Sequence, residues 1–151
     1  TAGPLPPCQP ACPILCHQDI TLRALHVLRA ASVVLAEDTR HTGRLLSAYG
    51  IPPPELMSYH AHNERARAAA VVRRLAGGSE VVALVSDAGT PGISDPGAVL
   101  VQAAIDAGVR VVPLPGPAAF VSAAVASGLS TSTLLFCGFL PPKSGARRVR
   151  L

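Results

Sequence analysis

The sequence predicts an α/β fold, a three-layer α/β/α domain with a mainly parallel sheet. Strand-like and helix-like segments alternate from residue 19 onward, which is typical of layered α/β architectures. The strand-like runs are unpatterned and aliphatic, as in strands buried on both faces. Hydrophobic residues make up 49% of the 151 residues but aromatic residues only 3%, with no tryptophan. We therefore expect a core of Val, Leu, Ile and Ala.

The first half of the chain gives three helices and two strands. Asp19 or Thr21 can cap a helix with apolar positions at helical spacing, and residues 32–36 (SVVLA) predict a buried strand. A second helix ends at Gly50. The last two elements are a short strand over 56–59 and a long amphipathic helix over 64–75.

The second half continues the alternation. Residues 81–85 predict a buried strand, and 95–107 a helix that Ser94 or Asp95 can cap. After these we expect a strand over 109–114, a helix over 118–127 and a last strand over 134–140. Residues 141–151 are interpreted as a linker.

Residues 1–17 differ from the rest of the chain. Five prolines fall in the first thirteen positions, together with Cys8 and Cys12, and Cys16 follows. The prolines exclude a regular helix that would align the thiols for a metal. We interpret this segment as aberrant or disordered, and residues 18–140 as the folded domain.

Charge and hydropathy narrow the class of protein. The net charge is +4, and Lys143 is the only lysine among 13 basic residues, so the rest are arginines, which favour bidentate contacts with phosphate. This balance permits a nucleic-acid partner without requiring one. No apolar run has the length of about 20 residues needed for a membrane span, and no signal peptide is recognisable. We expect a cytoplasmic protein without membrane contact.

The loop after the strand at 81–85 is the strongest candidate for a binding site. Residues 86–97 (SDAGTPGISDPG) combine glycines, which allow close approach of a ligand to the backbone, with stiffening prolines. Open α/β sheets place their ligands at the carboxyl ends of the strands. An elaborate helix cap is the alternative explanation.

Four polar clusters follow predicted strands: 37–41, 86–95, 115–118 and, after a weaker strand, 60–64. In a parallel sheet they should converge into one cleft. Glu37 and Asp38 could instead cap a helix, and His60 and His62 could be solvated loop residues rather than metal ligands. We expect no metal site. The glycine spacing of nucleotide-binding loops is absent, which disfavours a dinucleotide or nucleoside triphosphate.

Five segments together resemble the tetrapyrrole-methylase-like family. They are AEDTRHTGRLL (36–46), HAHNE (60–64), VALVSDAGTPGISDPG (82–97), RVVPLPGP (110–117) and GFLPPKSGARR (138–148). The match runs from about residue 18 to 150. Within the family, the EDTRHTG and HxHNE segments favour a branch that acts on ribosomal RNA.

The resemblance implies the N-terminal domain of a two-domain enzyme that binds S-adenosylmethionine (SAM). It implies methylation of the ribose 2′-oxygen of a cytidine in small-subunit ribosomal RNA, within the 30S subunit, and a homodimer. The cofactor contacts carried over from the family are Asp87, Ala88, Gly89, Thr90, Ile93, Ala118 and Ala119.

Transfer of a methyl group to a hydroxyl benefits from a base or hydrogen-bond acceptor. The candidates for this catalytic role are Asp38, Glu37 and His60. Arg40 and Arg44 are the candidates for binding RNA phosphates. Arg65 and Arg67 are better interpreted as a solvated helix face.

Two departures from the family pattern bear on activity. The family begins with a strand and a Pro-Ile-Gly-Asn turn, but Leu15 and Cys16 replace the Gly and Asn, as an upstream reading-frame error would produce. The family also carries a second domain after the segment that 141–151 matches, so we interpret 141–151 as a linker remnant and expect weak activity or none. The alternatives are a non-catalytic half-enzyme able only to fold or dimerise, and a methyltransferase of a tetrapyrrole or other small molecule.

Overall fold

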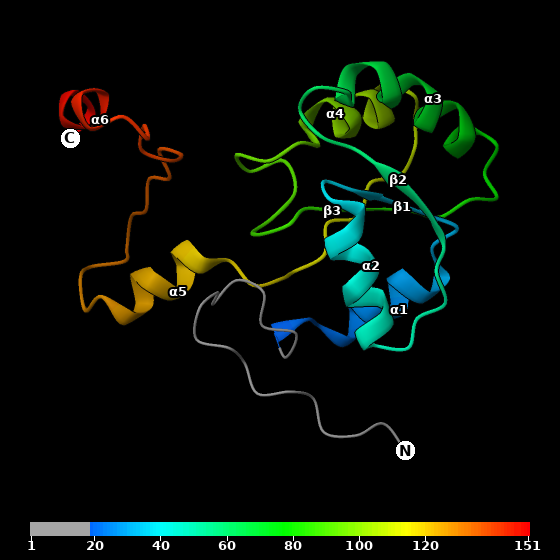
Figure 1. Cartoon of the computed structure of the whole chain (residues 1–151), viewed down its shortest axis with the longest axis horizontal. Coiled ribbons are helices and arrows are strands. Elements are labelled where there is room, and N and C mark those ends of the chain that lie inside the picture. Colours follow the sequence, from blue (N-terminus) through cyan, green and yellow to red (C-terminus); the bar gives the residue numbers. More distant parts are fainter. Residues whose placement is uncertain (1–18) are drawn as a thin grey trace. The chain divides into compact units, whose positions relative to one another are not determined.

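The computed structural model describes residues 19–151, so the predictions for residues 1–17 lie outside the described residues. The chain divides into two compact units, one that reaches Ala119 and one that spans Phe120–Leu151. Figure 1 shows the helices and strands with their labels. Each unit is described by itself.

The first unit is built around a parallel sheet with the strand order β2-β1-β3. The strands are β1 (Val33–Ala36), β2 (Glu55–Ser58) and β3 (Val82–Val85). β1 is the central strand, and all four of its residues are buried. Its aliphatic run is buried on both faces, which explains why it lacks an alternating polar pattern.

Two helices cover each face of this sheet (Figure 1). On one face, α1 (Leu22–Ala30) and α2 (Thr39–Ala48) bury Leu25, Leu28 and Leu46 against Val34. On the other face, α3 (Glu64–Ala76) and α4 (Ala98–Asp106) pack with Val33 and Leu35. The predicted three-layer α/β/α arrangement is confirmed.

Local sequence explains where the first two helices begin. The Thr21 hydroxyl accepts a hydrogen bond from the Ala24 backbone N–H at 3.1 Å, which selects Thr21 over Asp19 as the cap of α1. Asp38 caps α2 by accepting a hydrogen bond from the Arg40 N–H at 2.8 Å. Gly50, with φ of +58°, follows the C-terminus of α2 as predicted.

Arg74 of α3 ties together the amino ends of two strands. Its guanidinium donates to Glu55, the first residue of β2, at 2.9 and 3.0 Å, and to Glu80, two residues before β3, at 2.9 and 3.1 Å. The two carboxylates raise the pKa of Arg74, Glu80 first. This network lies at the end of the sheet opposite to the polar loops.

The strands predicted over 109–114 and 134–140 are wrong, because neither segment is a strand in the structure. Pro113, within the first segment, has no N–H to donate to a ladder, and prolines are confined to strand ends and edges. In the second segment Gly138 has a φ of +75°, which interrupts an extended backbone. The apolar pattern was real, but Val112 and Leu135 are exposed rather than paired.

The second unit contains most of α5 (Ala119–Ala126) and all of α6 (Ser144–Arg150). The helix predicted over 118–127 is confirmed, whereas the linker predicted over 141–151 contains α6. Phe136 contacts Phe120 and Phe139, with ring centroids 5.1 and 6.3 Å apart. Among residues 19–151, no helix has both the length and the apolar character required to cross a membrane.

The central strand should control the stability of the first unit. Leu35 is fully buried, so Leu35→Ala should lower the free energy of unfolding by about 2–5 kcal/mol through lost burial and a residual cavity. Leu22 is 85% exposed on α1, so the same change there should shift it by less than about 0.5 kcal/mol. Urea denaturation of both variants measures the difference, and equal effects would contradict the assignment of β1 to the core.

Candidate functional site at the carboxyl edge of the sheet

The three strands end at the same level, and this brings three polar segments to one edge. In the strand register Ala36 pairs with Ser58 on one side and with Val85 on the other. The chain therefore leaves the sheet at residues 37, 59 and 86 in adjacent positions. Clusters 37–41 and 86–95 therefore lie at one edge of the sheet as predicted, and cluster 60–64 follows the neighbouring strand there. The single cleft that they would line stays a prediction.

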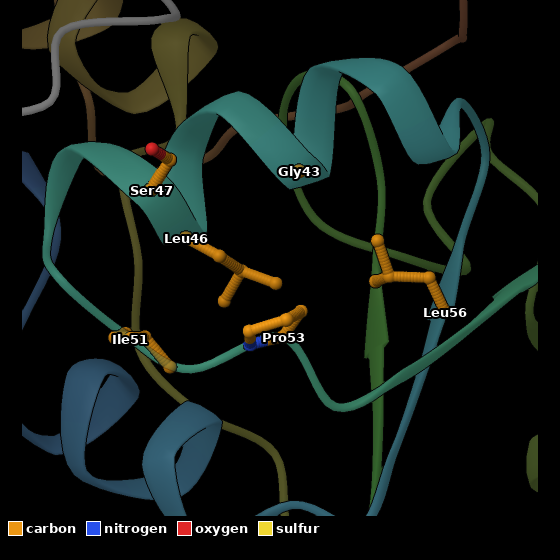
Figure 2. Close-up of a pocket in the computed structure, with 6 residues that line it drawn as sticks. All are labelled: Gly43, Leu46, Ser47, Ile51, Pro53 and Leu56. Atoms are coloured by element: carbon orange, nitrogen blue, oxygen red, sulfur yellow. The ribbon is translucent and has the colours of Figure 1, made fainter.

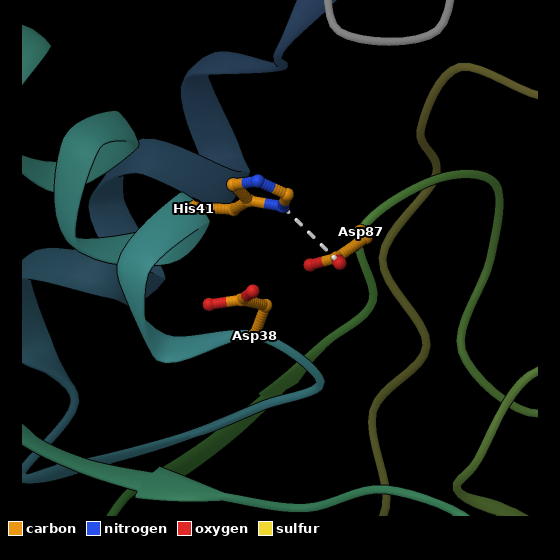
Figure 3. Close-up of side chains that lie close together, drawn as sticks. All are labelled: Asp38, His41 and Asp87. Atoms are coloured by element: carbon orange, nitrogen blue, oxygen red, sulfur yellow. Dashed lines mark hydrogen bonds and ion pairs between the residues drawn. The ribbon is translucent and has the colours of Figure 1, made fainter.

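Direct contacts connect the 37–41 segment with the loop over 86–97. His41 Nδ1 lies 3.2 Å from Asp87 Oδ2, and Figure 3 shows this ring nitrogen turned toward the carboxylate. The Glu37 carboxylate accepts a hydrogen bond from the Asp87 backbone N–H at 3.4 Å. Asp87 is thus held through its backbone and its side chain by the segment that follows β1.

Asp38 lies beside His41 and Asp87, but its carboxylate is already paired with the Arg40 guanidinium. Its carboxylate accepts from Arg40 Nε at 3.0 and 3.2 Å and from Arg40 Nη2 at 2.6 Å. These hydrogen bonds, with the capping bond from the Arg40 N–H, hold the pKa of Asp38 well below its usual range. Asp38 remains ionised at neutral pH and is a weak proton acceptor.

Sequence reasoning did not select His41 as a site residue, although it lies in the cluster that carried the argument. The structure places it in the first turn of α2, beside Asp87 (Figure 3). The available signal was its position three residues after the capping Asp38, which turns it toward the start of the helix. Its partner, Asp87, follows the neighbouring strand β3 and could be identified only from the pairing of β1 with β3.

The 86–97 loop has an unusual backbone. Ser94 has a φ of +60°, which is uncommon outside glycine, and such strain is often associated with functional sites. The Ile93 N–H donates to the Thr90 carbonyl at 3.1 Å, and Ser86 Oγ donates to the Ala88 carbonyl at the same distance. Internal hydrogen bonds thus shape the loop.

The proposed capping of α4 by Ser94 or Asp95 is wrong. The residue before the helix is Gly97, and no side chain caps it. Gly97 has a φ of +143°, and its N–H donates to Glu64 Oε2 of α3 at 3.3 Å.

Burial, and secondarily the nearby Asp87, raise the pKa of Asp95, while a hydrogen bond from Ser86 opposes the shift.

His60 belongs to a local network after β2. Its backbone N–H donates to Asn63 Oδ1 at 2.9 Å, and its Nε2 lies 3.1 Å from Asn63 Nδ2. Its Nδ1 is buried and unpartnered within the described part of the chain. The His62 ring meets it edge to face, with centroids 5.8 Å apart. His60 thus lies at the predicted edge but turns toward Asn63.

The remaining predicted site residues are mostly accessible. Ala88, Gly89 and Ile93 are exposed, and Thr90 is half-buried. Arg40 and Arg44 project from α2 and are exposed. Ala118 is half-buried and Ala119 exposed, and the structure describes no hydrogen bond from 115–118 to the other clusters. Because 109–114 is not a strand, no strand end brings the turn at 115–118 to the edge of the sheet.

Asp38, His41 and Asp87 offer three potential metal ligands within 4.8 Å of one another (Figure 3). Two oxygens and one nitrogen would suit a borderline divalent ion. However, Arg40 already neutralises Asp38 through a bidentate pair, and His41 is bonded to Asp87. Binding an ion would require both arrangements to be broken.

A separate apolar pocket of about 260 Å³ lies between α2 and the connector that precedes β2 (Figure 2). Apolar side chains, together with Gly43 and Ser47, form its wall: Leu46, Ile51, Pro53 and Leu56. None of the predicted site residues lines it. Its lining lacks the charged groups that converge at the carboxyl edge.

Comparison with known proteins identifies the class to which this fold and this loop edge belong. A family model described as tetrapyrrole (corrin/porphyrin) methylases matches residues 13–150. The match covers most of the chain, so the chain belongs to this family.

More specific relatives carry the name "Ribosomal RNA small subunit methyltransferase I". The chain is 53% identical to the Xylella fastidiosa protein over 133 residues, which are 88% of this chain and 48% of that protein. It is 51% identical to the Haemophilus influenzae protein over 141 residues, or 93% and 49%. The Synechocystis protein is 46% identical over 130 residues, or 86% and 46%. The chain spans about half the length of these relatives.

Gly97 should be required for the close packing of the 86–97 loop against Leu84 of β3. A Cβ there would lie 2.8 Å from Leu84 Cδ2 and 3.3 Å from the Gly92 nitrogen, in a backbone conformation that side chains rarely adopt. We expect Gly97→Ala to lower the free energy of unfolding by about 1–3 kcal/mol.

Gly78 is the matched control for Gly97. Its φ is +75°, but a Cβ would meet no atom within 4 Å. Gly78→Ala should therefore lower the free energy of unfolding only through the strain of a side chain at positive φ, by about 1 kcal/mol. Thermal denaturation with hydrogen exchange of the 86–97 amides compares the two variants. A larger loss in Gly78→Ala would contradict the close approach at Gly97.

Proposed function

We propose that this chain forms the cofactor-binding half of a SAM-dependent methyltransferase that acts on small-subunit ribosomal RNA. The names of relatives about 50% identical to it support this activity. The finer proposal is methylation of the ribose 2′-oxygen of a cytidine. The observation that carries the proposal is the junction of the 86–97 loop with the 37–41 segment at one sheet edge.

The 86–97 loop fits a molecule with the chemistry of SAM. Asp87 keeps one third of its side chain exposed, so its carboxylate can accept hydrogen bonds from hydroxyl or ammonium groups. Ala88 and Gly89 have small or no side chains, which lets a ligand reach the backbone, and Ile93 offers an apolar surface that is 46% exposed. Together with Thr90, Ala118 and Ala119, these are the proposed cofactor contacts.

When bound, SAM supplies a methyl group attached to a positively charged sulfur. Alignment of the hydroxyl with that group contributes at most about 7–11 kcal/mol to catalysis. Glu37 serves this alignment because it holds the backbone of Asp87. Asp38 holds Arg40, whose side chain is 81% exposed, and Arg40 and Arg44 are the proposed phosphate contacts for RNA. Asp38, Glu37 and His60, which the sequence suggests as acceptors for the hydroxyl proton, lie in the segments that follow β1 and β2 at this sheet edge.

Calorimetric titration with SAM tests the cofactor site. The chain should bind SAM, and Asp87→Asn should weaken binding about tenfold by removing a charged acceptor. Asp106→Asn is the matched control, because Asp106 is an exposed carboxylate at the end of α4 that accepts from Gln102. Equal affinity of the two variants would place the cofactor elsewhere.

The transfer reaction is measured in two proteins, with unmethylated small subunits and labelled SAM. One is the chain itself, for which we expect little or no transfer. The other is a hybrid in which the chain replaces the matching half of the Xylella fastidiosa relative. The hybrid should yield 2′-O-methylcytidine after nuclease digestion. Methylation of a tetrapyrrole with unmodified RNA would instead support the small-molecule alternative.

We also propose that the protein is a homodimer. The unit Phe120–Leu151 exposes many large apolar side chains, including Leu135 at 85% and Phe139 at 76%, and exposed apolar surface of this kind commonly marks an interface. Light scattering should give twice the mass of one chain. Phe139→Glu should give a monomer, whereas the control Leu22→Glu, on α1 of the other unit, should leave the dimer intact. A monomeric wild type would refute the proposal.

A further inference from the structure

His41 has one ring nitrogen engaged and the other available. Its Nδ1 lies 3.2 Å from Asp87 Oδ2, while within residues 19–151 its Nε2 has no hydrogen-bond partner. Nearly half of the side chain, 47%, is exposed. A carboxylate that accepts from Nδ1–H leaves the lone pair of a neutral imidazole on Nε2, as in dyads in which a carboxylate orients a histidine base.

The other candidate bases at this edge are less available. Asp38 is saturated by Arg40 and by the cap of α2. Glu37 accepts from the Asp87 N–H and is half-buried. The Nε2 of His60 faces Asn63, and its Nδ1 is buried. Of Asp38, Glu37, His60 and His41, only His41 combines an exposed side chain, a contact with the proposed cofactor loop and a second ring nitrogen without a partner in the described residues.

We propose that His41 is the general base of the methyl transfer and that Asp87 is its positioning residue, an inference that rests on the proposed function. The hydroxyl oxygen forms a bond to the methyl carbon while the carbon–sulfur bond breaks and its electron pair stays on sulfur. The hydroxyl proton moves to His41 Nε2. The Asp87 carboxylate, 3.2 Å from Nδ1, stabilises the imidazolium that results.

Asp87 contacts the proposed base, His41, and also belongs to the loop proposed to hold the cofactor. Asp87 is the second residue of the 86–97 loop, and its backbone N–H is held by Glu37 while its carboxylate faces His41. A shift of the loop would therefore move the partner of the base as well. The proposed proton acceptor and the residues that would hold the methyl donor thus lie on two segments that the β1–β3 pairing aligns.

The first test requires no activity. Nitrogen-15 NMR of the 151-residue chain reports which ring nitrogen of neutral His41 carries the proton. We expect the Nδ1–H form in the wild type and its loss in Asp87→Asn. The Nε2–H form in the wild type would overturn the assignment of His41, whatever the methylation assay gives.

The second test measures transfer by the hybrid protein as a function of pH. His41→Ala should lower the rate by about 10²–10⁴-fold, with SAM affinity unchanged within about twofold. The acid limb of the wild-type profile, about tenfold per pH unit for a required neutral histidine, should disappear. His26→Ala, on the exposed face of α1, is the control and should retain the wild-type rate.

The two proposals fail in different ways. If His41→Ala binds SAM and retains both the wild-type rate and the acid limb, His41 is not the base although the proposed function stands. If the wild-type chain and the hybrid do not bind SAM, the proposed function is wrong. The tautomer measurement still decides whether Asp87 orients His41.

Discussion

The level pairing of β1 with both of its neighbours is the constraint on which the candidate site depends. Val33 to Ala36 pair residue by residue with Glu55 to Ser58 and with Val82 to Val85, so all three strands end together. A slip of one residue would turn the side chains of β1 to the opposite face. The register therefore assigns Val34 to the α1 and α2 side of the core and Val33 and Leu35 to the α3 and α4 side, and it sets the position of Asp87 relative to His41.

The two ends of the sheet have different roles. At the amino ends, Arg74 joins Glu55 and Glu80 in a charge network that ties β2, α3 and the approach to β3. Exposed ion pairs contribute little individually, but a shared guanidinium restrains three segments at once. At the carboxyl ends, the polar groups are half-exposed and bonded across loops. The sheet is thus restrained at one end, while its other end presents groups that can meet a ligand.

Sequence reasoning succeeded mainly where local chemistry decides, with the cap predicted for α4 at Ser94 or Asp95 as an exception, and failed where partners decide. Thr21, one of the two caps predicted for α1, the stop at Gly50 and the buried run of β1 follow from residues close in the chain, and all three are confirmed. An apolar run such as 109–114 becomes a strand only beside a partner, and here Pro113 and the absence of pairing leave it irregular. His41 was missed for the same reason, since its significance depends on Asp87, 46 residues away.

The buried Tyr59 gives one face of the sheet its own optical reporter. The chain has two tyrosines and no tryptophan. Tyr49 packs against the cluster beneath α1 and α2, and Tyr59 is buried with α3 and α4. Burial, and then the charge of Glu64, raise the pKa of Tyr59 to about 12, so the native fold keeps its phenol neutral. Ultraviolet absorbance of tyrosinate in alkali therefore reports opening of the α3 and α4 layer, which would expose Tyr59.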